Sequence, residues 1–148
     1  MELPDDAIEA ILDRWPVATL ATSGARGPHA VPIVFARVAG ALWSPIDGKP
    51  KRGGELARTR HVRRDPRVSL LISHYDEDWT HLWWLRADGV AEIRSGPAEA
   101  SALAALRRKY PQYERVDLLG PDALLLRIAI TARRSWCASL AAVAYIPR

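Results

Sequence analysis

Two long segments of this chain alternate between apolar and polar residues, and this alternation constrains the fold more than any other feature. A period of two is typical of a β-strand that buries one face, because successive side chains point to opposite sides of a sheet. Residues 124–136 follow this pattern, and so do residues 82–94. In the second segment the apolar face consists of Trp83, Leu85, Ala87, Ala91 and Ile93, and the other face carries Trp84, Arg86, Asp88, Glu92 and Arg94.

Four shorter segments also read as strands, at residues 17–22, 29–38, 41–46 and 68–75. Pro32 predicts an edge strand or a bulge, and Gly89 predicts a bulge or kink in the long strand. Helices are expected at residues 5–15, 55–64 and 97–110. Consecutive strands with few helices between them predict a mainly β, α+β fold with an antiparallel barrel or sheet. The 148 residues suit a single domain, spanning residues 1–148.

The composition favours a protein of a reducing, aqueous compartment. The single cysteine, Cys137, excludes an internal disulfide. No run approaches the roughly 18 apolar residues that a membrane helix needs. The acidic N-terminus lacks the apolar core of a signal peptide. We therefore expect a cytoplasmic protein that does not enter a membrane.

The positive charge is concentrated in one segment. The net charge is +4, and residues 51–67 alone carry seven basic and two acidic side chains. This segment follows a strand and a turn at residues 47–50, an arrangement that can present cations and N–H donors to a phosphate. We favour Lys49, Lys51 and Arg58 as ligands of a small anion, and Arg63 and Arg64 as a solvated helix face.

Other chemical signals are weaker. The sequence lacks a dinucleotide-binding glycine motif, a phosphate-binding loop and a nucleophile elbow. The loop of Asp76, Glu77 and Asp78 could ligate a metal with His74 and His81, but a solvated hairpin loop is the simpler interpretation, and no metal site is predicted. Among the tryptophans, Trp83 fits a core, Trp84 an interface or covered site, and Trp79 a ligand contact in a loop.

Several segments together resemble the pyridoxamine 5'-phosphate oxidase-like split-barrel family of flavin and deazaflavin oxidoreductases. The resemblance is strongest to the subgroup that uses the deazaflavin coenzyme F420, and it extends over most of the chain, from about Trp15 to Trp136. The segments that carry it are 17–22, 29–33, 47–51, 62–71, 76–79 and 82–91. Many relatives have asparagine where this chain has His61, and the family pattern does not account for the apolar tail at residues 138–146.

The resemblance implies a six-stranded antiparallel split β-barrel of the FMN-binding type, with short flanking helices. It implies a homodimer with cofactor sites at the subunit interface, and an F420- or FMN-dependent oxidoreductase that transfers hydride to or from a small molecule. No side chain is then required as catalytic acid or base, and no catalytic residue is assigned. The implied cofactor-binding residues are Lys49, Lys51 and Arg58 at the phosphate, the backbone of Val31, Pro32, Ile33, Ser44, Pro45 and Ile46 along the ring, and Trp79 reaching the partner's site.

Two other functions stay open at this point. The same fold could serve a protein without enzymatic activity that binds a flavin, F420, or haem or another tetrapyrrole. A nucleic-acid binder would use the basic segment and show strong salt dependence. The strands lack the exposed aromatic and basic residues of a base-stacking surface, so no nucleic-acid partner is expected.

Overall fold

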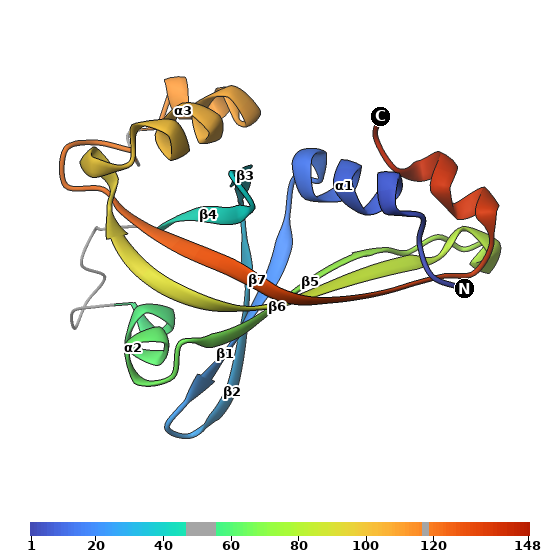
Figure 1. Ribbon diagram of the computed structural model, residues 1–148, viewed down its shortest axis with the longest axis horizontal. Coiled ribbons are helices and arrows are strands. Elements are labelled where there is room, and N and C mark those ends of the chain that lie inside the picture. The colour runs from blue at the N-terminus through green and yellow to red at the C-terminus, as the bar shows by residue number, and fades with distance from the viewer. Residues whose placement is uncertain (47–55, 117–118) are drawn as a thin grey trace.

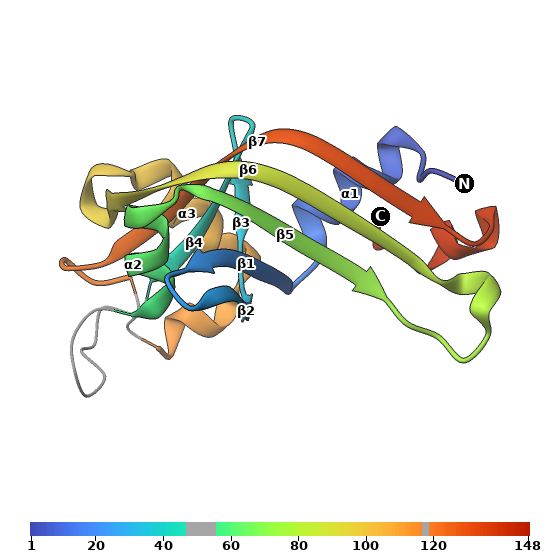
Figure 2. The same cartoon turned by 90° about the horizontal axis from the view of Figure 1, so that it is seen from below.

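The computed structural model describes residues 1–46, 56–116 and 119–148. A single antiparallel sheet dominates this part of the chain, with the strand order β2-β1-β5-β6-β7-β4-β3 (Figures 1 and 2). Its strands are β1 (Ala18–Gly24), β2 (Gly27–Ile33), β3 (Ala36–Val38), β4 (Ala41–Ile46), β5 (Arg67–His74), β6 (Trp83–Ser95) and β7 (Leu124–Cys137). The helices are α1 (Asp5–Arg14), α2 (Ala57–Arg64) and α3 (Ala100–Lys109), with 3-10 turns η1 (Trp79–His81), η2 (Gly96–Ala98), η3 (Pro111–Glu114) and η4 (Leu140–Tyr145).

The two alternating segments form the long central strands β6 and β7, which pair along almost their whole length. The ladder shifts register between Asp88 and Gly89, which confirms the predicted bulge. A Cβ at Gly89 would lie 2.5 Å from the carbonyl oxygen of Ala129, so only glycine fits this close approach. The bulge lets both strands bend while they keep one buried face.

The prediction of a mainly β, antiparallel fold is confirmed, but the predicted six-stranded split barrel differs from the structure in two respects: the described residues form seven strands, and the sheet is not closed. The expected strand at residues 29–38 is broken at Phe35. The backbone N–H of Phe35 donates to the Tyr110 hydroxyl at 3.0 Å, and that hydroxyl lies 2.8 Å from the Phe35 carbonyl oxygen. Because both backbone groups are engaged by a side chain, Phe35 cannot continue a ladder. The separated strands β2 and β3 form the two edges of the sheet. The edge position of β2 agrees with the prediction made from Pro32.

The core consists of two apolar clusters, which bury opposite faces of β4: Leu42 and Ile46 belong to the larger cluster, and Ala41 and Trp43 to the smaller one. The larger cluster contains the buried stripe of α1, namely Ala7, Ile8, Ile11 and Leu12, against the inward residues of β1, β5 and β6. The smaller cluster packs Leu103 and Leu106 of α3 against Trp43 of β4. Glu9 of α1 also pairs with Arg133 of β7 at 2.8 Å and with Arg37 of β3. Helix α1 is therefore held by burial and by ion pairs.

The apolar tail has a structural role that the family pattern did not predict. Backbone hydrogen bonds in both directions join Met1 to Cys137. Ala142 and Ile146 then join the larger core cluster. The Tyr145 ring stacks on the His74 ring, with centroids 5.4 Å apart. The tail thus closes the end of the sheet where the N-terminus lies (Figure 1).

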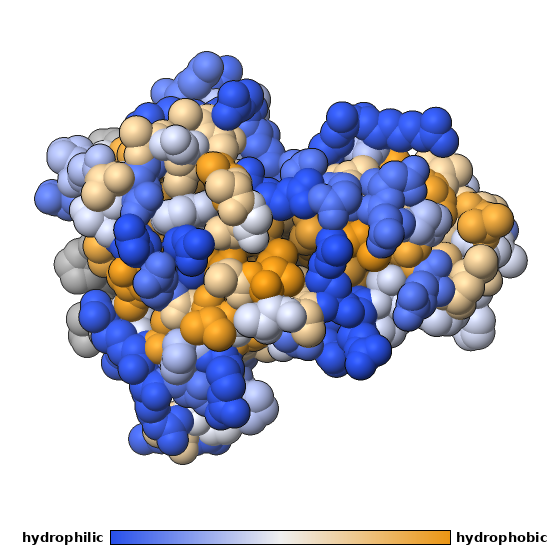
Figure 3. All heavy atoms as spheres, viewed as in Figure 1, coloured by the Kyte–Doolittle hydropathy of each residue, from blue (hydrophilic) through white to orange (hydrophobic). Residues whose placement is uncertain are grey.

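The convex side of the central strands leaves apolar side chains uncovered. Leu71, Val90 and Trp136 are exposed, and Trp136 pairs across the ladder with Trp84. In the view of Figure 1, apolar side chains also gather in the hollowed middle of the molecule, between hydrophilic margins (Figure 3). Among the described helices, none has the length and apolar character to cross a membrane.

Candidate functional site

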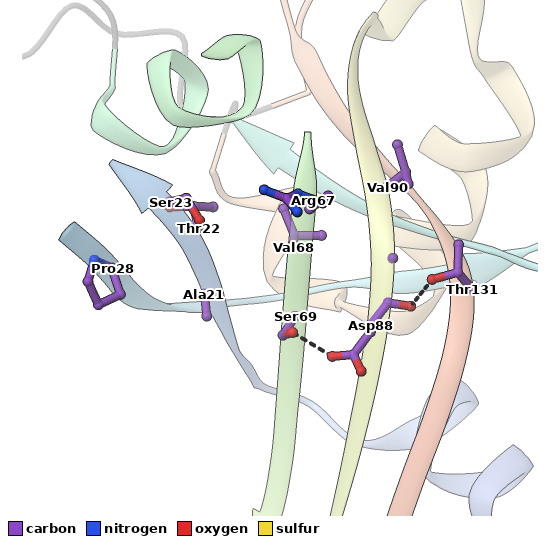
Figure 4. A pocket seen from close by; sticks show the side chains of 11 residues that line it. Ala21, Thr22, Ser23, Pro28, Arg67, Val68, Ser69, Asp88, Val90 and Thr131 are labelled. Carbon is purple, nitrogen blue, oxygen red and sulfur yellow. Dashed lines mark hydrogen bonds between the residues drawn. The ribbon is translucent and has the colours of Figure 1, made fainter. Parts of the chain in front are cut away.

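Two adjacent hollows lie where β1 leaves the central sheet. Strands β1 and β5 pair only as far as Ala21 and Ser69, and the rest of β1 continues in a hairpin with β2. The divergence opens a hollow of about 540 Å³, which we call the sheet trough (Figure 4). The trough is lined by Ala21, Thr22, Ser23, Pro28, Arg67, Val68, Ser69, Asp88, Gly89, Val90 and Thr131.

The polar side chains of the trough are hydroxyl groups, the carboxylate of Asp88 and the exposed guanidinium of Arg67, which pairs with Asp65. The Ser69 hydroxyl donates to Oδ1 of Asp88 at 2.5 Å, and the Thr131 hydroxyl donates to the Asp88 carbonyl at 3.2 Å (Figure 4). The Arg86 guanidinium lies 3.2 Å from the same Asp88 oxygen. Asp88 is thus neutralised by its neighbours, and the trough offers a polar floor without a free negative charge.

The second hollow, of about 660 Å³, lies between α2 and the β1–β2 hairpin. We call it the cationic pocket. Its cationic and histidine side chains are Arg26 and His29 from the hairpin and Arg60, His61 and Arg64 from α2. The α2 residues that line it recur at helical spacing, at positions 57, 60, 61 and 64, so one face of α2 points into the pocket. None of the described residues that line this pocket is acidic, which makes it suitable for an anion.

Thr22 and the histidines connect the two hollows. The Thr22 hydroxyl, from the trough, lies 2.8 Å from Nδ1 of His61 in the pocket. The His29 ring meets the His61 ring edge to face, with centroids 5.1 Å apart. Nδ1 of His29 is buried, and within the described part of the chain it has no hydrogen-bond partner. Pro28 lines both hollows, so they form one continuous surface.

The electrostatics of the pocket disfavour a proton on His61. Burial lowers the pKa of His61, and the nearby His29, Arg60 and Arg64 lower it further. An anion in the pocket would offset this repulsion.

The structure places the predicted residues in different regions. Lys49 and Lys51 lie outside the described residues. Arg58 is half-buried on α2 but does not line the cationic pocket. Val31, Ile33 and Ile46 belong to the same apolar cluster as Leu56, just before α2, so these strands and the start of α2 meet around one core. The side chains of Ser44, Pro45 and Ile46 are buried in β4, and Pro32 is exposed on β2.

Trp79 is separate from this region in one protomer. It is 69% exposed in η1, beyond the ends of β5 and β6 that lie farthest from α2 (Figure 2). A contact between Trp79 and the cofactor would require a second subunit. That contact stays a prediction.

Several residues of the cationic pocket were not singled out by the sequence pattern. They are Arg26 and His29, together with the role of His61, which stood out only as a departure from asparagine; Thr22 of the adjacent trough was not singled out either. Arg64 is exposed, as expected, but it also forms part of the pocket wall. The helical spacing of positions 57, 60, 61 and 64 was the available signal, because it places Arg64 on the same face as Arg60.

Comparison with solved structures gives a consistent fold. The conserved hypothetical protein Rv2991 from Mycobacterium tuberculosis matches with a TM-score of 0.72 and 27% identity, over 93% of this chain and 87% of that one. A protein described as an F420 reductase matches with a TM-score of 0.63 and 22% identity, over 89% and 98%. HutZ, the heme storage protein from Vibrio cholerae, matches with a TM-score of 0.68 and 17% identity, over 93% and 95%. The last two similarities concern the fold alone.

None of the curated protein sequences matches the chain. The model of the pyridoxamine 5'-phosphate oxidase family, in contrast, matches residues 4–137. That match includes every described strand and both hollows of the site. The chain belongs to the pyridoxamine 5'-phosphate oxidase family.

Proposed function

We propose that the chain is an oxidoreductase that binds a phosphorylated flavin or the deazaflavin F420, with the phosphate in the cationic pocket. The observation that carries this proposal is the convergence of Arg26, His29, Arg60, His61 and Arg64 on one pocket, whose described lining residues include no carboxylate. A phosphate needs several charge-assisted donors held on rigid elements. A strand hairpin and a helix supply them here.

The protein's own contribution is binding and orientation. Guanidinium groups of Arg60 and Arg64 would neutralise the phosphate, and the hydrogen bond between Thr22 and His61 fixes the imidazole ring beside them. The sheet trough extends from the pocket with hydroxyl donors, which suits a polar chain between phosphate and ring. When bound, the cofactor supplies hydride transfer. Lys49, Lys51 and Arg58 remain predicted phosphate ligands, and β2 and β4 the predicted support of the ring.

A binding titration tests the cofactor class. We expect the purified protein to bind FMN or F420 with a micromolar or lower dissociation constant, and riboflavin, which lacks the phosphate, much more weakly. F420 is expected to bind more tightly than FMN by a modest margin. Inorganic phosphate should compete with FMN. Equal binding of riboflavin and FMN would contradict the assignment of the cationic pocket to the phosphate.

The alternative is a protein that binds a flavin, F420 or haem without turnover. Two observations favour it: the fold similarity to the heme storage protein HutZ, and the histidine pair His29 and His61, since imidazole is a common haem ligand. Steady-state oxidation of reduced cofactor with candidate acceptors separates the two functions. A Soret band that requires His29 or His61, without turnover of flavin or F420, would favour haem binding.

A homodimer is part of the proposal. The uncovered apolar side chains on the convex side of β5, β6 and β7 provide surface for a second copy. A second copy could also bring Trp79 to a site that it does not reach within one subunit. The oligomeric state is tested below.

A further inference from the structure

The side chain of Lys109, at the end of α3, lies in an unusual environment. Its Nζ is buried, and it has no hydrogen-bond partner among the described residues. The nitrogen lies 3.8 Å from the centroid of the fully buried Phe35 ring and 5.4 Å from that of Tyr110. An aromatic face attracts a cation but does not replace the lost hydrogen bonds to water. The environment therefore makes the uncharged amine more accessible than it is for a solvated lysine.

The same side chain lines a hollow of about 600 Å³ between the C-terminal turns of α1 and α3. Strand β3 lies between these two helices (Figure 1). The other charged residues of the hollow are Asp13, Arg14, Arg37 and Arg108. No residue lines both this hollow and the cationic pocket, so the two are separate sites.

The charges around the hollow leave two cations available. Arg37 and Asp13 neutralise each other through two hydrogen bonds of 2.7 and 2.8 Å. Arg14 and Arg108 are exposed, and neither makes an ion pair or hydrogen bond within the described residues. Guanidinium groups bind carboxylates in a defined orientation. The hollow thus combines a desolvated amine with groups that recognise an anion.

We propose that this hollow binds a small carbonyl compound that carries a carboxylate, and that Lys109 forms an imine with it. The Nζ lone pair attacks the carbonyl carbon, and the resulting carbinolamine loses its oxygen as water. The nitrogen ends double-bonded to that carbon, with no change in oxidation state. Arg14 and Arg108 hold the carboxylate. This site is independent of the flavin proposal and adds a second ligand class to the molecule.

The protonation state of Lys109 supports the chemistry. Burial lowers the pKa of Lys109 to about 8, and the charge of Asp13 opposes this effect. A larger share of this amine is therefore nucleophilic near neutral pH than for a solvated lysine. Lys109 lines the hollow with part of its side chain, and the proposed reaction requires its terminal torsions to rotate so that Nζ turns from the Phe35 ring toward the bound carbonyl.

Reductive trapping tests the proposal. The protein is incubated with glyoxylate, an aldehyde that carries a carboxylate, the imine is reduced with cyanoborohydride, and labelled peptides are quantified by mass spectrometry. The chain has only two other lysines, Lys49 and Lys51, which serve as internal comparators. At pH 7.5 we expect Lys109 to be labelled at least about tenfold faster, since one pKa unit changes the amine fraction about tenfold. Labelling at a rate equal to that of Lys49 and Lys51 would overturn the proposal.

Two further comparisons test recognition of the carboxylate. Acetaldehyde, which lacks the carboxylate, should label Lys109 more slowly than glyoxylate. Arg108→Gln should slow labelling by glyoxylate several-fold and leave labelling by acetaldehyde unchanged. If Arg108→Gln changes neither rate, or if both aldehydes label Lys109 equally, the assigned carboxylate recognition is wrong. Lys109→Arg, which keeps the charge, should abolish the label at this site while thermal unfolding shows that the fold is retained.

Discussion

The hydroxyl of Thr22 lies 2.8 Å from Nδ1 of His61 and joins the end of β1 to α2. This contact sets the orientation of the imidazole ring, because the other ring nitrogen, Nε2, then lies beside Gly24. A Cβ at Gly24 would be only 2.7 Å from Nε2. The hairpin and the helix are thus fitted to each other at the cationic pocket.

Gly24→Ala should therefore weaken cofactor binding. The added methyl group would displace the His61 ring, since a separation under 3.0 Å requires one group to move. We expect FMN affinity to fall several-fold, measured by fluorescence titration. Ala104→Ser, at an exposed position of α3 that lines neither hollow of the site, is the control and should bind FMN like the unmodified protein. Unchanged affinity in Gly24→Ala would mean that His61 does not contact the phosphate.

The two neighbouring arginines at the end of α2 should differ in their effect. Arg64 lines the cationic pocket, whereas Arg63 is exposed and does not line it. A charge-assisted contact contributes about 1.5–3 kcal/mol, so Arg64→Ala should weaken FMN binding roughly ten- to a hundredfold. Arg63→Ala should change it little, and riboflavin binding should be similar in both variants. Equal losses of FMN affinity would place the phosphate elsewhere on the helix.

Stability should fall as the pH decreases through the histidine range. The pKa of His61 is lowered in the folded protein from its ordinary value of 6.5. As the pH falls below 6.5, His61 of the unfolded chain takes up a proton before His61 of the folded protein does, so the free energy of unfolding decreases. This loss of stability is complete once the pH lies below the pKa of His61 in the folded protein. His61→Asn should reduce this dependence, measured by thermal unfolding between pH 8 and pH 5. Bound phosphate should also reduce this pH dependence, because the anion stabilises the imidazolium of His61. If neither His61→Asn nor phosphate changes the pH dependence, the role assigned to His61 in the cationic pocket is wrong.

The Tyr110 hydroxyl should be important for stability. It lies 2.9 Å from the Pro16 carbonyl oxygen as well as bonding both backbone groups of Phe35. Burial raises the pKa of Tyr110 to about 12, so the hydroxyl remains a donor over the usual pH range. Tyr110→Phe leaves the buried N–H of Phe35 without an acceptor and should destabilise the fold by about 1–3 kcal/mol in chemical denaturation. Tyr113→Phe is the matched control, because the Tyr113 hydroxyl makes no hydrogen bond within the described residues. This variant should lower the free energy of unfolding by less than Tyr110→Phe does.

The convex side of the sheet should be the dimer interface. Leu71 is 44% exposed there, and Leu71→Asp would place a charge on a surface that a partner buries. We expect the unmodified protein to be a dimer at micromolar concentration in light scattering and Leu71→Asp to shift it toward the monomer. Val116→Asp, in the segment after η3, should remain dimeric. A monomeric unmodified protein would contradict both the interface and a cofactor site shared between subunits.

The sequence determined the local elements and the family. Alternation identified β6 and β7, Pro32 marked an edge strand, and Gly89 marked the bulge, because each of these features depends on neighbours along the chain. The same local reasoning placed the positive charge near α2. It did not identify the partners of that charge, because helical spacing shows which residues share a face but not what the face is packed against.

Only the tertiary structure determined where the strand breaks, which residues form the site and what surrounds Lys109. Phe35 looks like part of a continuous strand, and only the hydroxyl of Tyr110, far along the chain, shows why the strand is interrupted and the sheet remains open. Thr22, His29 and His61 are unremarkable separately, and they form a site only because α2 packs on the β1–β2 hairpin. The environment of Lys109 likewise depends on the distant Phe35 ring. Desolvation and the convergence of charges arise from contacts between segments that are distant in the sequence. Because the periodicity of apolar and polar residues depends only on neighbours along the chain, it does not predict those contacts.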